Sequence, residues 1–123
     1  MDNERRKVAS NPIHPLFRTA ILGQPVVDVE RDEDGLGIRL AEGWDISVWS
    51  ACSLHEQGVE IDLQRVSEII GASLVEFVRE YNHERLVFSQ GHEVIVDLDA
   101  RSPSQPEAMM VQGPNSLIVV WND

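Results

Sequence analysis

The segment Leu22–Trp49 reads LGQPVVDVERDEDGLGIRLAEGWDISVW, and the chain repeats its pattern once. The segment Ile70–Asp97, IGASLVEFVREYNHERLVFSQGHEVIVD, aligns with it at a constant offset and without a gap. Identical residues recur at the matched positions Gly23 and Gly71, Val27 and Val75, Arg31 and Arg79, Gly43 and Gly91, and Val48 and Val96. Self-similarity of this kind decides architecture before any other feature. It predicts two structurally equivalent halves.

Each half is expected to begin with a short helix. Apolar residues at 16, 17, 20 and 21 share one helical face, and those at 63, 66, 69 and 70 repeat the pattern. Pro15 and Asp62 suit the start of a helix, and Gly23 and Gly71 suit the position just beyond its end. Alternation of period two then predicts strands at 27–32, 36–40 and 44–49, at 75–80, 86–88 and 92–97, and in two terminal hairpins, 51–61 and 108–121.

A single meander of this kind has one apolar face that it cannot bury alone. The sequence therefore predicts a mainly β protein of two duplicated antiparallel meanders, each preceded by a short helix. They would pack with pseudo-twofold symmetry as a sandwich or a barrel. Residues 1–12 have no hydrophobic period and are expected to form a flexible tail. Residues 13–123 would form a single domain of two repeats, about 13–61 and 62–123.

The composition narrows the class of partner. A net charge of −11 argues against nucleic acid and anionic membranes, which both require clustered Lys and Arg, and favours a basic protein. No apolar run is long enough to span a membrane, and the charged N-terminus is unlike a secretory signal. Cys52 is the only cysteine, so no internal disulfide is possible. We therefore expect a cytoplasmic protein, either a monomer or a homodimer.

Three patterns suggest a metal ion, and each lacks ligands. Glu30–Gly35 has the spacing of the opening of a calcium loop, but its twelfth position is Ala41. Cys52-x-x-His55 needs two further zinc ligands. The three His-Glu pairs, at 55, 83 and 92, lack the second histidine of a zinc protease helix and are expected to be solvated turn residues. We therefore predict no metal, no cofactor and no catalytic residue.

The repeated pattern also carries a resemblance. Leu22-Gly23-x-x-Val26-x-x-Val29 and its second copy, followed by Gly113-Pro114 and Trp121, resemble an uncharacterised family of small acidic bacterial proteins. These proteins have two tandem hydrophobic-Gly-x-x-Val β units, and some of their relatives resemble immunity proteins of contact-dependent toxins. The resemblance implies a protein-binding role and transfers no catalytic residue.

An acidic row and one tryptophan are the candidate partner-binding residues. Trp44 follows the turn at Glu42–Gly43, where we expect it to be exposed. The others are Asp28, Glu30, Asp32, Glu33 and Asp34. The leading hypothesis is a non-catalytic protein-binding module, an immunity-type or antitoxin-type inhibitor of a basic partner protein. The alternatives are a small enzyme that uses His and acidic residues at the seam between the repeats, and a structural accessory subunit.

Overall fold

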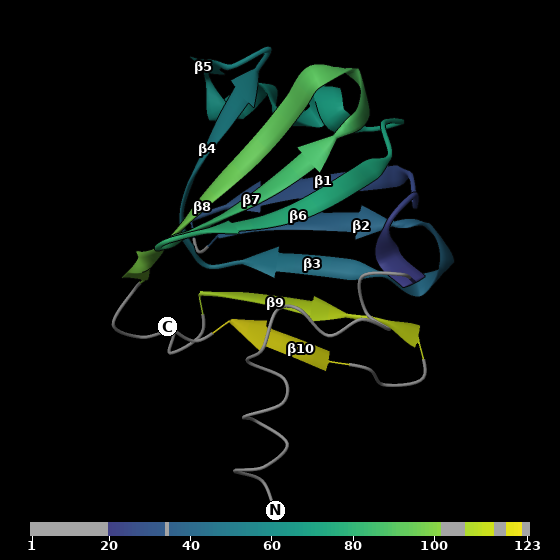
Figure 1. Cartoon of the computed structure of the whole chain (residues 1–123). Helices are drawn as coiled ribbons and strands as arrows, with labels where there is room; N and C mark the ends of the chain where they lie inside the picture. The colour runs from purple at the N-terminus through teal and green to yellow at the C-terminus, as the bar shows by residue number, and fades with distance from the viewer. Residues whose placement is uncertain (1–19, 34, 102–107, 115–117, 122–123) are drawn as a thin grey trace, which may run out of the picture.

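The computed structural model describes residues 20–33, 35–101, 108–114 and 118–121, which form two antiparallel sheets (Figure 1). The first sheet has the order β1-β2-β3-β9-β10. Its strands are β1 (Val26–Asp32), β2 (Gly35–Leu40), β3 (Asp45–Val48), β9 (Met109–Gln112) and β10 (Ile118–Trp121). The second sheet has the order β5-β4-β8-β7-β6. Its strands are β4 (Ser50–Glu56), β5 (Val59–Ile61), β6 (Leu74–Glu80), β7 (His83–Phe88) and β8 (His92–Arg101). The protein is thus mainly β, and within the described residues neither sheet closes into a barrel.

Each terminal hairpin joins the sheet of the other half. β4 follows β3 along the chain but pairs with β8, with β5 at its other edge, whereas β9 follows β8 but pairs with β3, with β10 at its other edge. Only Trp49 separates β3 from β4, so the chain leaves one sheet and enters the other within a single residue. The expectation that each half forms its own five-stranded meander is therefore wrong. Local alternation identifies strands, but it carries no information about which distant strand each one pairs with.

A bulge changes which residues of β1 face the core. Val26 pairs with Leu40 and Asp28 pairs with Arg39, which leaves Val27 as an extra residue that is 50% exposed. An alternation that places Val27 with Val29 on the core face is therefore wrong, because the bulge adds one residue to the strand. β6 has the same irregularity at Val75, which is also 50% exposed.

The helix of the second half begins and ends where the sequence predicts. A 3-10 helix, η2 (Leu63–Ile69), is capped by Asp62, whose carboxylate accepts a hydrogen bond of 2.9 Å from the backbone N of Gln64. Gly71 follows at a φ of 94°, and Gly23 has a matching φ of 91°. The helix predicted at 15–22 lies outside the described residues except at its end, where residues 20 and 21 are helical.

Two further one-turn helices, η1 (Ala41–Gly43) and η3 (Ser89–Gly91), connect the second and third strands of each half. Their middle residues, Glu42 and Gln90, have positive φ values of 64° and 73°, and the glycines that follow have φ values of 85° and 95°. Positive φ at these positions is what a tight connection between two antiparallel strands requires.

The two halves meet at an isolated antiparallel bridge between Pro25 and Ser73. Four backbone hydrogen bonds of 2.7–3.0 Å flank the bridge in two matched pairs: Gly23 N to Leu74 O with Gly71 N to Val26 O, and Val26 N to Ala72 O with Leu74 N to Gln24 O. Within each pair, the donors occupy matched positions of the two repeats, and so do the acceptors. The halves therefore bind each other through the same atoms.

One buried hydrophobic cluster draws side chains from both sheets. Ile38 and Ile46 come from the first sheet, Leu54 and Leu86 from the second, and all four are almost completely buried. The buried polar residues are few: Ser50, Glu84 and His92 within the described chain. In the same residues, no helix is long and apolar enough to cross a membrane.

Candidate functional site

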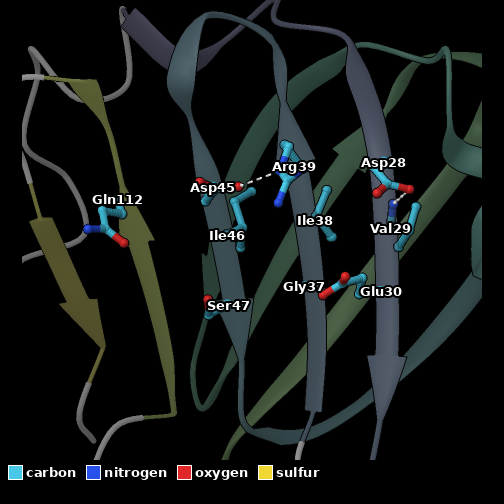
Figure 2. A pocket seen from close by; sticks show the side chains of 10 residues that line it. All are labelled: Asp28, Val29, Glu30, Gly37, Ile38, Arg39, Asp45, Ile46, Ser47 and Gln112. Carbon is cyan, nitrogen blue, oxygen red and sulfur yellow. Dashed lines mark hydrogen bonds and ion pairs between the residues drawn. The ribbon is translucent and has the colours of Figure 1, made fainter.

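A hollow of about 240 Å³ lies on the outer face of the first sheet (Figure 2). Gly37 forms its centre, because this position of β2 has no side chain, and a Cβ atom placed there would meet only Glu30, at 3.9 Å. The side chain of Glu30 extends from β1 across Gly37. The other outward-facing side chains around the hollow are those of Asp28, Arg39, Asp45, Ser47 and Gln112.

The hollow carries three carboxylates and one guanidinium group. Asp28, Glu30 and Asp45 supply the carboxylates, and Arg39 is the cation. The Nε atom of Arg39 lies 3.5 Å from Oδ1 of Asp45, and both side chains are at least half exposed, so this ion pair is weak. The net charge of the lining is therefore negative, and the site suits a cationic side chain from another molecule.

The second sheet contains Arg85 where the first contains Gly37. Gly37 pairs with Glu30 and Ser47, and Arg85, at the matched position of the second repeat, pairs with Val78 and Ile95. The Arg85 guanidinium donates to Glu80 at 3.2 Å and to Glu93 at 3.4 Å. The second sheet thus carries a cation at this position, whereas in the first sheet Gly37 has no side chain and the outer cation is Arg39, two residues further along β2.

The structure brings only part of the predicted acidic row to the hollow. Asp28 and Glu30 line it, and the Asp28 carboxylate also accepts a hydrogen bond of 2.9 Å from the backbone N of Val29. Asp32 follows on the same face of β1, where its carboxylate accepts a bond of 3.0 Å from Gly35 N. Glu33 is exposed in the adjoining turn, and residue 34 lies outside the described chain.

Trp44 is buried, so the expectation of an exposed binding residue is wrong. Its side chain is 4% exposed, and its ring lies against Gly113, where an added Cβ would come within 2.5 Å of the ring. The turn before Trp44 indicated exposure. The covering residue, however, belongs to the hairpin that arrives from the other half, and sequence proximity does not reveal it.

A cluster of ionisable side chains, missed by sequence reasoning, lies where β4 of the first half pairs with β8 of the second half. The Nε2 atom of His92 lies 3.2 Å from Oε1 of Glu68 and 3.8 Å from Oε2 of Glu56. Arg65 binds both carboxylates, through Nε at 2.6 Å from Glu68 and Nη2 at 3.3 Å from Glu56. The hydrogen bond from Arg65, assisted by His92, holds the pKa of Glu68 below its usual range, because both partners stabilise the charged carboxylate.

Two of the three His-Glu pairs are not the solvated turn residues that the sequence predicted. The His92 side chain is only 7% exposed, and Glu84 is buried. The pairing of β4 with β8 also brings the His55-Glu56 pair opposite the His92-Glu93 pair. Each histidine faces the glutamate of the other pair, His55 opposite Glu93 and His92 opposite Glu56. The only signal for this meeting is the pairing of two distant strands, which no local pattern contains.

Cys52 is partly buried and packs against the core, as expected of a small hydrophobic residue. Burial raises the pKa of its thiol, and the positive charge of Arg31 partly offsets this effect. A thiol with a raised pKa is a poor nucleophile at neutral pH.

No family model, curated protein or solved structure matches this chain. The arguments for function therefore rest on the geometry of its own residues.

Proposed function

We propose that this protein is a non-catalytic binding module whose first sheet takes an arginine side chain of a basic partner protein into the hollow over Gly37. The observation that carries the proposal is the contrast between Gly37 and Arg85. At matched positions of the two sheets, one residue leaves a hollow among carboxylates and the other fills the equivalent place with a guanidinium group. Arg85 therefore serves as an internal example of how the incoming arginine would lie.

The charges around the hollow favour this partner. An arginine over Gly37 would reach Glu30 and Asp45, the residue matched to Glu93 of the second sheet. Guanidinium groups bind carboxylates through paired, charge-assisted hydrogen bonds, which give both strength and orientation. The net charge of −11 would add long-range attraction for a basic protein and speed their encounter.

The class of partner that fits best is a basic enzyme whose own ligand is anionic. A nuclease toxin has a cationic phosphate-binding cleft, and an acidic surface that covers this cleft would inhibit it. This is the action of an immunity protein or an antitoxin, in agreement with the resemblance of the repeated units to immunity-like proteins. Because one chain builds the whole hollow, the proposal applies to a monomer and a homodimer alike.

The same proposal includes a duplicated fold. We take the two halves to be copies related by a pseudo-twofold axis near Pro25 and Ser73, with the sheets packed as a sandwich. The gapless alignment, the matched bulges at Val27 and Val75 and the reciprocal hydrogen bonds support this relationship. An experimental structure tests it: Cα positions of 22–49 should superpose on those of 70–97 without an insertion. A different strand order in the two segments would contradict it.

The binding function is tested by comparative capture from the native host. Wild-type protein and Gly37→Arg would each be immobilised, and the retained proteins identified by mass spectrometry. We expect a basic protein that binds the wild type and not Gly37→Arg. Gln64→Arg is the matched control, because it adds the same charge at an exposed position of η2. Equal retention by all three proteins would contradict a role for the hollow.

The seam between β4 and β8 supports a second candidate, a small enzyme. His92 between Glu56 and Glu68 has the residue types of general acid and base catalysis. An enzyme of this kind would lose its activity in Glu68→Gln and keep it in Gly37→Arg. The binding module would instead retain its partner in Glu68→Gln and lose it in Gly37→Arg.

A further inference from the structure

The His92 cluster is independent of the hollow over Gly37 and has a chemistry of its own. We propose that His92, Glu56 and Glu68 bind a divalent transition-metal ion of the Zn²⁺ type. One imidazole nitrogen and two carboxylate oxygens from these residues lie within 4.8 Å of one another. This assignment goes beyond the binding function and replaces the expectation, drawn from sequence, that the chain holds no metal.

The distances suit a small ion. Zinc bonds to nitrogen and oxygen are about 2.0–2.2 Å long, which separates tetrahedral ligands by about 3.3 Å. The Nε2 atom of His92 is already 3.2 Å from Oε1 of Glu68 and 3.8 Å from Oε2 of Glu56. Both carboxylate side chains are more than one third exposed, which leaves room for a small movement toward the ion and for a water ligand.

His92 itself points to a ligand. Its side chain is 7% exposed and its Nε2 is directed at the two carboxylates, while its buried Nδ1 has no hydrogen-bond partner among the described residues. If the metal binds Nε2, the imidazole is neutral and its proton is on Nδ1.

The other half of the protein shows that the fold does not require ionisable groups at this place. Trp44 is matched to His92 in the repeat, and its ring packs against Gly113. Ala20, at the same offset, is matched to Glu68. The matched positions thus hold apolar residues, Trp44 and Ala20, in one half and the ionisable residues His92 and Glu68 in the other. The charged set is therefore a feature of this site and not of the architecture.

Arg65 orients the two carboxylates. Its Nε and Nη2 atoms bind Oε2 of Glu68 at 2.6 Å and Oε1 of Glu56 at 3.3 Å, the oxygens that do not approach His92 most closely. A weaker bond of 3.1 Å joins Nη2 to Oε1 of Glu68, and the metal would take over this oxygen. In metal sites, the carboxylates that bind the ion are commonly held in place by hydrogen bonds from neighbouring residues, as Arg65 would do here.

The test is a titration of the metal-free full-length protein with Zn²⁺ by isothermal calorimetry, together with the visible absorption of Co²⁺. We expect one ion per chain and a Co²⁺ spectrum that intensifies as its coordination number falls. The affinity should be micromolar, because the unpaired Nδ1 lacks the acceptor that usually strengthens a histidine ligand by about 10–100-fold.

Variants then locate the site. Glu68→Gln and His92→Gln should each weaken binding at least tenfold, whereas Glu60→Gln and His83→Gln, at positions outside the cluster, should not. Glu68→Gln keeps an oxygen that accepts from Arg65, and circular dichroism checks that it is folded. Absence of binding up to millimolar Zn²⁺, or equal binding by cluster and control variants, would overturn the proposal. Neither result would bear on the hollow over Gly37.

Discussion

Gly37 and Arg85 occupy matched positions on the outer face, each in the middle strand of the three that its half contributes to its sheet. Arg85 reaches carboxylates on both neighbouring strands, Glu80 on β6 and Glu93 on β8. Gly37 reaches none, and the carboxylates of Glu30 and Asp45 border the hollow that it leaves. The first sheet therefore has no guanidinium group at the Gly37 position, although Arg39 lies nearby and pairs weakly with Asp45, and a partner protein is the proposed source of a second one.

The first prediction concerns association kinetics. Charge reversal at Glu30 and Asp28 should slow the association with the basic partner at least about tenfold at low salt, because both carboxylates line the hollow. The wild-type rate should fall steeply towards physiological salt, where the screening length is about 8 Å. Stopped-flow measurements across a salt series check both effects. Glu60→Lys reverses the charge of a single exposed position outside the hollow and should slow the association much less. An association rate of the wild type that does not depend on salt would contradict electrostatic steering.

The second prediction concerns the contact between Trp44 and Gly113. Gly113→Ala should destabilise the protein by about 1–3 kcal/mol, because the new methyl group would overlap a buried ring. Gly37→Ala is the matched control: its methyl group makes only an ordinary contact with Glu30 at 3.9 Å, and the free energy of unfolding should change by less than about 0.5 kcal/mol. Urea denaturation of the three proteins measures both values. Equal stability of the two variants would show that Trp44 does not pack on Gly113.

The third prediction concerns Gly71, which follows η2 at a φ of 94°. Gly71→Val should cost more than about 1 kcal/mol through backbone strain, since a β-branched residue rarely adopts positive φ. No atom lies within 4 Å of a Cβ placed there, so the effect would be purely conformational. Gly71→Asn should be milder, because asparagine tolerates this region better. An unchanged denaturation midpoint in Gly71→Val would rule out a helix stop at this glycine.

The fourth prediction concerns acid stability. The pKa of Glu68 is lowered in the folded protein, chiefly by its hydrogen bond with Arg65. A depressed carboxyl pKa stabilises the fold above the unfolded-state pKa, and this contribution is lost as the pH falls through the folded-state value. Arg65→Gln should therefore raise the pKa of Glu68 and weaken the loss of stability in acid. NMR titration of the Glu68 carboxyl carbon provides the measurement; an identical titration in the variant would refute the coupling.

Much of the local structure follows from the sequence. The cap at Asp62, the glycine stop at Gly71 and the turns at Glu42 and Gln90 all depend on residues within a few positions of one another. These are the features that backbone propensity and hydrogen-bonding capacity determine. The acidic face of β1 was also predictable in part, because Asp28, Glu30 and Asp32 alternate along one strand.

The features that sequence reasoning missed depend on distant pairing. The bulge at Val27 shifts the alternation by one residue, and the exchange of the terminal hairpins brings Gly113 over Trp44 and Glu56 beside His92. The hollow itself needs the register of β1 with β2, which places Gly37 opposite Glu30. Pairing energies between distant strands decide these contacts, and the period of a single strand does not report them.

The central claim is that the hollow over Gly37 receives an arginine from the partner, and Gly37→Arg tests it most directly. Its new side chain would occupy the hollow from within, much as Arg85 extends over the other sheet, and the position has no positive φ and only an ordinary 3.9 Å contact between an added Cβ and Glu30. We predict a protein as stable as the wild type whose affinity for the captured basic partner falls at least about tenfold, the scale expected when a buried charge-assisted contact is removed. Unchanged affinity in a stable Gly37→Arg protein would contradict the account.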